Sequence, residues 1–198
     1  MIVGITGGIG SGKSTLSEKL REAGYSVYDT DSAARRLQNE DAEIRKKIVA
    51  LFGSESYIDT VLNRKFIADI VFKTPNLLQQ LNELIHPAVQ ADFKTWSASR
   101  IAERYLFLEC AILFQGDFLK LVDKIILVKA PQSIRIQRVM KRNNLTEKQV
   151  IERINNQMTD AEMASKSDFV IDSNETDIRK MEVQSFIEKL NFKCFSAH

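Results

Sequence analysis

The sequence predicts an α/β protein with a five-stranded parallel sheet flanked by helices, and two observations carry this prediction. Short runs of apolar and β-branched residues recur along the chain, separated by segments with helical periodicity. These runs are almost continuously apolar, which is typical of strands in a parallel sheet that helices cover on both faces. The first thirty residues also read as strand, glycine-rich turn, helix and strand, the order of a βαβ unit.

The elements follow from local patterns. Strands are predicted at residues 1–6, 25–29, 105–110, 124–129 and 168–172. The first helix spans residues 14–24, because Leu16 and Leu20 are four residues apart and Gly24 is placed to end the helix.

Residues 31–104 contain no convincing strand and predict several helices. One runs from Asp41, a candidate N-cap, to Leu51; a second covers 63–72, and a third begins at Pro75. Pro87 is expected to break the helical pattern before a long segment that ends at Arg104. Because this interval is too long for an ordinary crossover, we interpret it as a helical insertion in one domain of residues 1–198.

The last third of the chain again predicts helices. One begins at Pro131 and ends at Arg142, and Thr146 with Gln149 and Thr159 with Glu162 have the spacing of capping boxes. Residues 176–190 predict a final amphipathic helix.

Composition limits the partners and the location. The net charge of +2 is too small to indicate binding of nucleic acid or a membrane, so any anion site must be local. The two cysteines suggest no disulfide framework and no metal site. No secretory signal and no continuous apolar span are recognisable, so we expect a cytoplasmic protein.

Five of the eight glycines lie in the opening segment MIVGITGGIGSGKST. Residues 7–14 match G-x-x-x-x-G-K-[ST], the phosphate-binding P-loop, between a predicted strand and a predicted helix. Glycines allow positive φ and a close approach of the backbone to phosphate, while N–H groups at the helix start form an anion site. We therefore predict that a nucleoside triphosphate binds to Gly8, Gly10, Ser11, Gly12, Lys13, Ser14 and Thr15.

Two of these residues have more specific roles. Lys13 is expected to contact the β- and γ-phosphates, and the Ser14 hydroxyl to bind Mg²⁺. The chain lacks the Asn-Lys-x-Asp and Asp-x-x-Gly strings of regulatory GTPases.

Two carboxylates, Asp29 and Asp31, follow at the end of the second strand, the edge where ligands gather in α/β sheets. One of them is a candidate to accept a proton from an attacking hydroxyl or to hold metal-bound water. The alternative is that one only caps the next helix.

Arg138 and Arg142 are four residues apart and so lie on one helix face. Arginines on a closing lid neutralise the charge that phosphoryl transfer spreads over oxygens, and exclusion of water prevents ATP hydrolysis. The alternative is a solvated basic face, to which Arg135, Lys141 and Lys148 would also belong.

Taken together, the chain resembles the dephospho-coenzyme A kinase family almost from end to end. The resemblance rests on GITGGIGSGKST, YDTDSAARRL, LNRKFIADIVF, LNELIHPAV, AILFQ and QMTDAEMASKSDFVIDSN. It implies transfer of the γ-phosphoryl group of ATP, with Mg²⁺, to the 3′-hydroxyl of dephospho-CoA, the last step of CoA synthesis. It also implies a five-stranded parallel sheet, a CoA-side insertion at about 31–104 and a lid at about 131–160 that contains Arg138 and Arg142.

The resemblance assigns the general base to Asp31 and leaves Asp29 as the competing candidate, with a possible role at the metal. The chain departs from the family pattern at Asn63, Ala111, Gln115 and Ser167, where Asp, Pro, Glu and Ala are usual. His86 is a further candidate for contact with substrate phosphate; the alternative is a hydrogen-bonded histidine at a helix break. Arg64 and Lys65 are candidates for contact with the substrate pyrophosphate; the alternative is ordinary surface charge.

Two alternative functions remain at this stage. One is a P-loop kinase for a nucleoside, a nucleoside monophosphate or shikimate; the insertion length and the His-Pro and Val-Ile-Asp strings argue against it. The other is a nucleotide-sensing module, which would need Lys13 but no carboxylate at Asp31.

Overall fold

The computed structural model describes residues 1–71, 73–174 and 178–195; for 179 and 191–195 it describes the backbone only. The chain divides into two compact units. The first unit combines Met1–Tyr28 with Glu103–His198, and the second is Asp29–Ala102.

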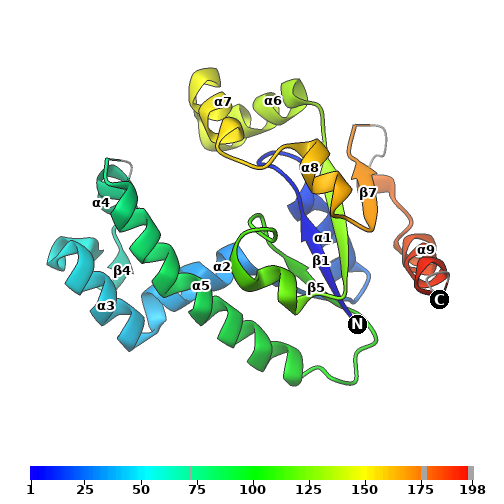
Figure 1. Cartoon of the computed structure of the whole chain (residues 1–198), viewed down its shortest axis with the longest axis horizontal. Coiled ribbons are helices and arrows are strands. Elements are labelled where there is room, and N and C mark those ends of the chain that lie inside the picture. Colours follow the sequence, from blue (N-terminus) through cyan, green and yellow to red (C-terminus); the bar gives the residue numbers. More distant parts are fainter. Residues whose placement is uncertain (72, 175–177, 196–198) are drawn as a thin grey trace. The chain divides into compact units, whose positions relative to one another are not determined.

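The sheet of the first unit confirms the predicted parallel architecture (Figure 1). Its strand order is β2-β5-β1-β6-β7, with β1 paired in parallel to both β5 and β6. The strands are β1 (Ile2–Thr6), β2 (Ser26–Asp29), β5 (Leu106–Glu109), β6 (Lys124–Lys129) and β7 (Phe169–Asp172). All five lie within the segments predicted from the sequence.

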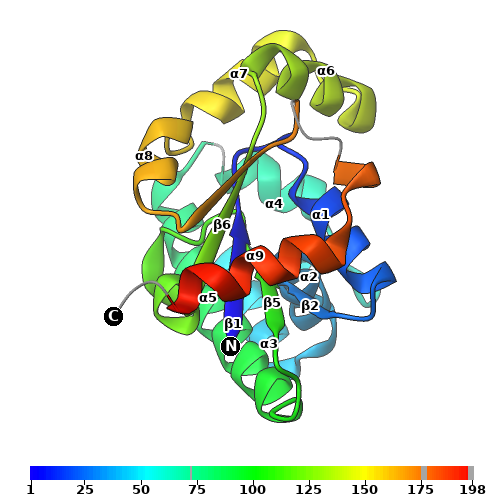
Figure 2. The same cartoon turned by 90° about the vertical axis from the view of Figure 1, so that its right-hand side faces the viewer.

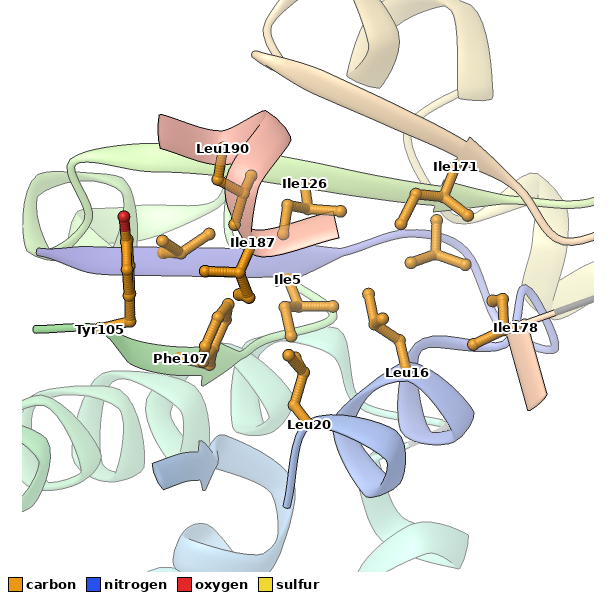
Figure 3. Close-up of a cluster of buried hydrophobic side chains, with 12 residues drawn as sticks. Ile5, Leu16, Leu20, Tyr105, Phe107, Ile126, Ile171, Ile178, Ile187 and Leu190 are labelled. Carbon is orange, nitrogen blue, oxygen red and sulfur yellow. The ribbon is translucent and has the colours of Figure 1, made fainter. Parts of the chain in front are cut away.

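The main core lies on the face of this sheet that α1 covers (Figure 3). Leu16 and Leu20 of α1 (Lys13–Glu22) are fully buried against Ile5 and Phe107. Helix α9 (Val183–Phe195) crosses the same face and adds Ile187 and Leu190 to the cluster (Figure 2). Burial of Leu16 and Leu20 therefore anchors the first turns of α1, which begins within the P-loop at Lys13.

The segment after β6 confirms the predicted helices and caps. It contains α6 (Gln132–Asn143), α7 (Glu147–Asn155) and α8 (Asp160–Ser165). Thr146 with Gln149 and Thr159 with Glu162 form complete capping boxes. These helices carry a small core of their own, in which Ile136, Val139 and Val150 are buried. We refer to residues 131–160, which the sequence analysis predicts to form a lid, as the lid segment.

The second unit is largely helical, as predicted. Its helices are α2 (Thr30–Glu40), α3 (Ala42–Phe52), α4 (Arg64–Val71) and α5 (Pro75–Ala98). Asp41 accepts a hydrogen bond from the backbone N–H of Ile44 and so caps α3. The prediction that this interval contains no strand is wrong, because β3 (Tyr57–Ile58) and β4 (Val61–Leu62) form an antiparallel pair. With two residues each, these strands are too short to give an alternating pattern.

The predicted helix break at Pro87 is also wrong, since α5 continues through it. Pro87 is exposed, so solvent can reach the carbonyl that a proline leaves without its helical donor. Ile85, Val89 and Phe93 on the buried face are at most 5% exposed. Their burial outweighs the local cost of the proline.

The C-terminal region differs from the single predicted helix. A 3₁₀ turn, η3 (Ile178–Lys180), precedes α9; residues 176 and 177 lie outside the described part of the chain. Two further 3₁₀ turns are η1 (Ser54–Ser56) and η2 (Gly116–Leu121). Cys110 is fully buried, and the side chain of Cys194 is not described. None of the described helices has the length and apolarity that a membrane span requires.

Candidate active site

The P-loop (residues 7–14) joins β1 to α1, as the sequence predicted. Gly7, Gly10 and Gly12 have φ values of 145°, 77° and 108°, which L-residues with a side chain rarely adopt. Gly12 is the N-cap of α1 and supplies no capping side chain. The N–H groups of the first turn of α1 are therefore available to an anion at this end of the helix.

Lys13 folds back over the loop. Its Nζ donates to the carbonyl oxygens of Gly7 at 2.6 Å and Gly8 at 3.1 Å. The ammonium group is thus held inside the curve of the loop, where it would meet the phosphates of a bound nucleotide.

The Ser14 hydroxyl donates to Oε1 of Glu109 at 2.8 Å. Glu109 is the last residue of β5, next to β1, and is only 7% exposed. The sequence analysis missed this carboxylate, because Glu109 lies within the apolar run YLFLEC. Its only signal was its place at the carboxyl end of a predicted strand.

Arg138 and Arg142 differ in their surroundings, although both are on α6. Nη1 of Arg138 donates to the carbonyl oxygens of Gly10 and Ser11 at 3.3 and 3.2 Å, and to Oγ of Ser173 at 2.9 Å. Arg142 is exposed, and its Nε donates to the neighbouring Asn143. The structure therefore brings Arg138 to the P-loop and leaves the Arg142 side chain at the solvent-exposed end of α6.

Arg135 does not belong to a solvated face. It is 5% exposed, and its Nε donates to the carbonyl oxygen of Ile9 at 2.9 Å. Sequence reasoning missed this residue because its buried position depends on how α6 packs on the P-loop, a tertiary contact that helical spacing does not reveal.

Asp29 and Asp31 lie in the second unit, where their side chains have different environments. Asp29 is the N-cap of α2: its Oδ1 accepts from the N–H groups of Asp31 and Ser32, and its Oδ2 from the Ser32 hydroxyl at 2.6 Å. Asp31 is exposed in the first turn of α2, and its carboxylate accepts no hydrogen bond from the described residues. The capping alternative therefore applies to Asp29, and the role of either residue in the reaction stays a prediction.

The other residues singled out in the second unit lie on α4, on α5 or just before α4. Burial lowers the pKa of His86, which lies half-buried on α5. Burial and, to a lesser extent, the nearby charge of Arg35 lower the pKa of Arg64. The side chain of Asn63 accepts from the N–H of Phe66 at 3.2 Å, a capping contact that asparagine and aspartate make equally well.

Gln115 is the N-cap residue of η2 and makes no side-chain capping hydrogen bond. The roles of Arg64, Lys65, His86 and Gln115 toward substrate all stay predictions. Among the described residues, no group of three or more His, Cys, Asp or Glu side chains is placed to hold a metal ion. A metal at the P-loop would thus depend on few protein ligands, as is usual for Mg²⁺ beside nucleotide phosphates.

Comparison with known proteins shows the family of the chain. The family model described as dephospho-CoA kinase matches residues 1–179. A curated dephospho-CoA kinase from Listeria monocytogenes serotype 4b is 38% identical over 192 residues, covering 94% of this chain and 96% of its own length.

Solved structures agree as well. A Thermus thermophilus protein superposes with a TM-score of 0.79 at 29% identity and covers 100% of this chain and 98% of its own. Dephospho-CoA kinase from Campylobacter jejuni superposes with a TM-score of 0.70 at 25% identity, over 94% and 96% of the two chains. With this family model over most of its length, the chain belongs to the dephospho-CoA kinase family.

Proposed function

We propose that the transfer of a phosphoryl group to dephospho-CoA depends on four catalytic residues: Lys13, Asp31, Arg138 and Arg142. As a member of the family, the protein transfers the γ-phosphoryl group of ATP to the 3′-hydroxyl of dephospho-CoA, giving CoA and ADP. The observation that carries the proposed roles is the P-loop itself, with Lys13 held inside its curve by the carbonyls of Gly7 and Gly8.

The chemistry requires positioning and charge stabilisation more than covalent catalysis. Negative charge spreads over the oxygens of the transferring group, and preorganised donors stabilise it best. The N–H groups of residues 10–15 and the Lys13 ammonium would supply these donors on the nucleotide side. Arg138, already at the P-loop, would act on the nucleotide, and Arg142 on the transferring group once the acceptor is bound.

Burial supports a ligand at Ser11. Ser11 is 1% exposed, and its Oγ has no hydrogen-bond partner among the described residues. Because a buried hydroxyl without a hydrogen-bond partner lowers stability, we expect a phosphate oxygen or a water to form a hydrogen bond with Ser11 Oγ.

The residues at the P-loop fit Mg²⁺. Ser14 Oγ and the buried Glu109 carboxylate are oxygen donors beside the place where phosphates would bind, and Mg²⁺ prefers such ligands together with phosphate oxygens. Bound there, the ion would neutralise phosphate charge. We propose that Ser14 is a direct ligand and that Glu109 orients it or holds metal-bound water. Asp29 remains a second candidate for metal-bound water, although its carboxylate already caps α2.

Glu109→Gln is expected to raise the Mg²⁺ concentration for half-maximal activity by roughly 10–100-fold, as loss of a residue that orients a metal ligand does. Glutamine keeps the size and can still bond to Ser14, but it lacks the charge. The measurement is initial rate against Mg²⁺ at saturating ATP. Glu103→Gln is the matched control, because Glu103 also accepts from a serine hydroxyl, that of Ser26. An unchanged Mg²⁺ requirement in Glu109→Gln would contradict this role.

The two lid arginines are expected to give different kinetic losses. Arg142→Ala should lower kcat with little change in the KM for ATP, because its proposed contact forms with the transferring group. Arg138→Ala should lower kcat and also raise the KM for ATP, since it removes contacts to the carbonyls of Gly10 and Ser11. Steady-state kinetics with each substrate varied distinguish the two patterns. A parent kcat in both variants would exclude both residues from the phosphoryl transfer.

We also propose that dephospho-CoA and ATP are the only partners the reaction needs, without nucleic acid or membrane, and that the protein acts in the cytoplasm. The small net charge argues against a nucleic-acid or membrane partner, and the lack of a disulfide framework fits a reducing compartment.

The function is tested by ADP release with a panel of acceptors: dephospho-CoA, nucleosides, nucleoside monophosphates and shikimate. We expect turnover with dephospho-CoA far above the others. Preference for another acceptor would favour a different small-molecule kinase. ATP binding without turnover of any acceptor would favour a nucleotide sensor.

A further inference from the structure

The outer side of the P-loop is held by side chains from the lid segment. Nε of Arg135 donates to the Ile9 carbonyl at 2.9 Å, and Oε1 of Gln157 accepts from the Ile9 N–H at 2.9 Å. Arg135 also donates to both carboxylate oxygens of Asp160, at 3.2 and 3.4 Å, and to Oε1 of Gln157 at 3.3 Å. We call Arg135, Gln157 and Asp160 the Arg135 brace.

These contacts determine which way the peptides at the tip of the loop face. In a trans peptide, the C=O of one residue and the N–H of the next point in opposite directions. The brace draws the Ile9 carbonyl outward, so the N–H of Gly10 is directed to the opposite, inner side of the loop. The Ile9 N–H also points outward, because it donates to Gln157 of the brace. The carbonyl of the same peptide, that of Gly8, therefore points inward, where it accepts from Lys13 Nζ and from the Ser11 N–H.

Ile9 also packs against the lid segment. The side chain of Ile9 packs against the cluster of Ile136, Val139 and Val150 in α6 and α7. A Cβ on Gly8 would overlap the guanidinium of Arg135, and one on Gly10 would lie 2.7 Å from the Arg135 carbonyl oxygen. Two P-loop positions therefore need glycine because α6 approaches so closely, in addition to any need of the phosphates.

Arg135 is suited to this place by its shape and charge. Its side chain is 7% exposed, and the carboxylate of Asp160, at 31%, lies against it. A buried cation is tolerated when it is paired and hydrogen-bonded, and the planar guanidinium donates to three residues on two chain segments at once. The compact ammonium group of lysine cannot reproduce this planar, forked arrangement of donors.

We propose that Arg135 is a positioning residue for ATP: through the brace it holds the Ile9–Gly10 peptide with its N–H toward the phosphates, and so couples the lid segment to nucleotide affinity. The proposal rests on the assignment of residues 7–14 as the phosphate-binding loop. It requires no contact between Arg135 and ATP. The expected signature is a loss of ATP affinity without a matching loss of affinity for dephospho-CoA.

Three variants test the brace. Arg135→Met keeps length but removes every donor, Arg135→Lys keeps charge but not the fork, and Asp160→Asn removes the charge that orients the guanidinium. The matched control is Arg153→Met, which removes the same charge from an exposed position on α7. For each we would measure the Kd of Mg·ATP by calorimetry, both KM values, kcat, and the melting temperature.

We expect Arg135→Met to raise the Kd and KM for ATP about tenfold or more, the size expected for loss of a charge-assisted hydrogen bond. Arg135→Lys and Asp160→Asn should raise them less, and Arg153→Met should not. The KM for dephospho-CoA should stay near the parent value in all four. If Arg135→Met does not fold, Arg135→Lys and Asp160→Asn decide the question alone.

A parent Kd for ATP in the folded brace variants, even with a lowered melting temperature, would overturn the proposal and leave Arg135 a purely structural residue. An equal rise in both KM values would overturn it too. Lys13→Ala, assayed in parallel, separates this failure from a wrong P-loop assignment: only the latter predicts normal ATP binding and turnover when Lys13 is removed.

Discussion

Lys13→Ala is expected to remove most of the activity while the protein stays folded. The loss in kcat should be roughly 10²–10³-fold, the range for removal of one preorganised donor to developing charge. The ammonium is positioned before ATP arrives, by the carbonyls of Gly7 and Gly8, so its loss removes stabilisation without reorganising the core under α1. Turnover of dephospho-CoA at saturating ATP measures the effect.

The matched control for this variant is Lys19→Ala, on the same helix. Lys19 forms a partly exposed ion pair with Glu22 at 3.3 Å, away from the P-loop. Its removal should leave kcat unchanged and cost little stability, as is usual for surface pairs. If Lys13→Ala is folded and turns over dephospho-CoA at close to the parent rate, the P-loop assignment is wrong.

The parts of the molecule that local signals determine were predictable from the sequence. The P-loop was found because strand, glycines, Lys13 and Ser14 are contiguous. The five strands were found because burial on both faces leaves continuous apolar runs. Capping boxes such as Thr146 with Gln149 involve residues only three apart, and the structure confirms them.

The residues that were missed depend on contacts distant in sequence. Glu109 meets Ser14 across 95 positions, and Arg135 meets Ile9 across 126. A carboxylate in an apolar run and an arginine in a basic helix look ordinary until the fold brings them to the P-loop. The Pro87 error has a related cause, because the buried face of α5 outweighs a local helix-breaking signal.

Asp31→Asn is expected to lower kcat by roughly 10²–10⁴-fold, the usual range for loss of a general base. A ribose hydroxyl is a poor nucleophile, so a carboxylate must orient it and accept its proton as the P–O bond forms. Asparagine keeps the shape but cannot take the proton. Of the two candidates, Asp31 has a carboxylate that accepts no hydrogen bond from the described residues, whereas both oxygens of Asp29 accept hydrogen bonds at the start of α2. ATP affinity should change little.

Asp29→Asn is the matched variant for this prediction. Asparagine caps a helix as well as aspartate does, so the start of α2 should survive, and any loss of activity would report chemistry or metal rather than folding. We expect Asp29→Asn to stay active, with at most a changed Mg²⁺ requirement. Measuring kcat, the Kd for ATP and the Mg²⁺ dependence in both variants decides the assignment. An inactive Asp29→Asn beside an active Asp31→Asn would transfer the role of base to Asp29.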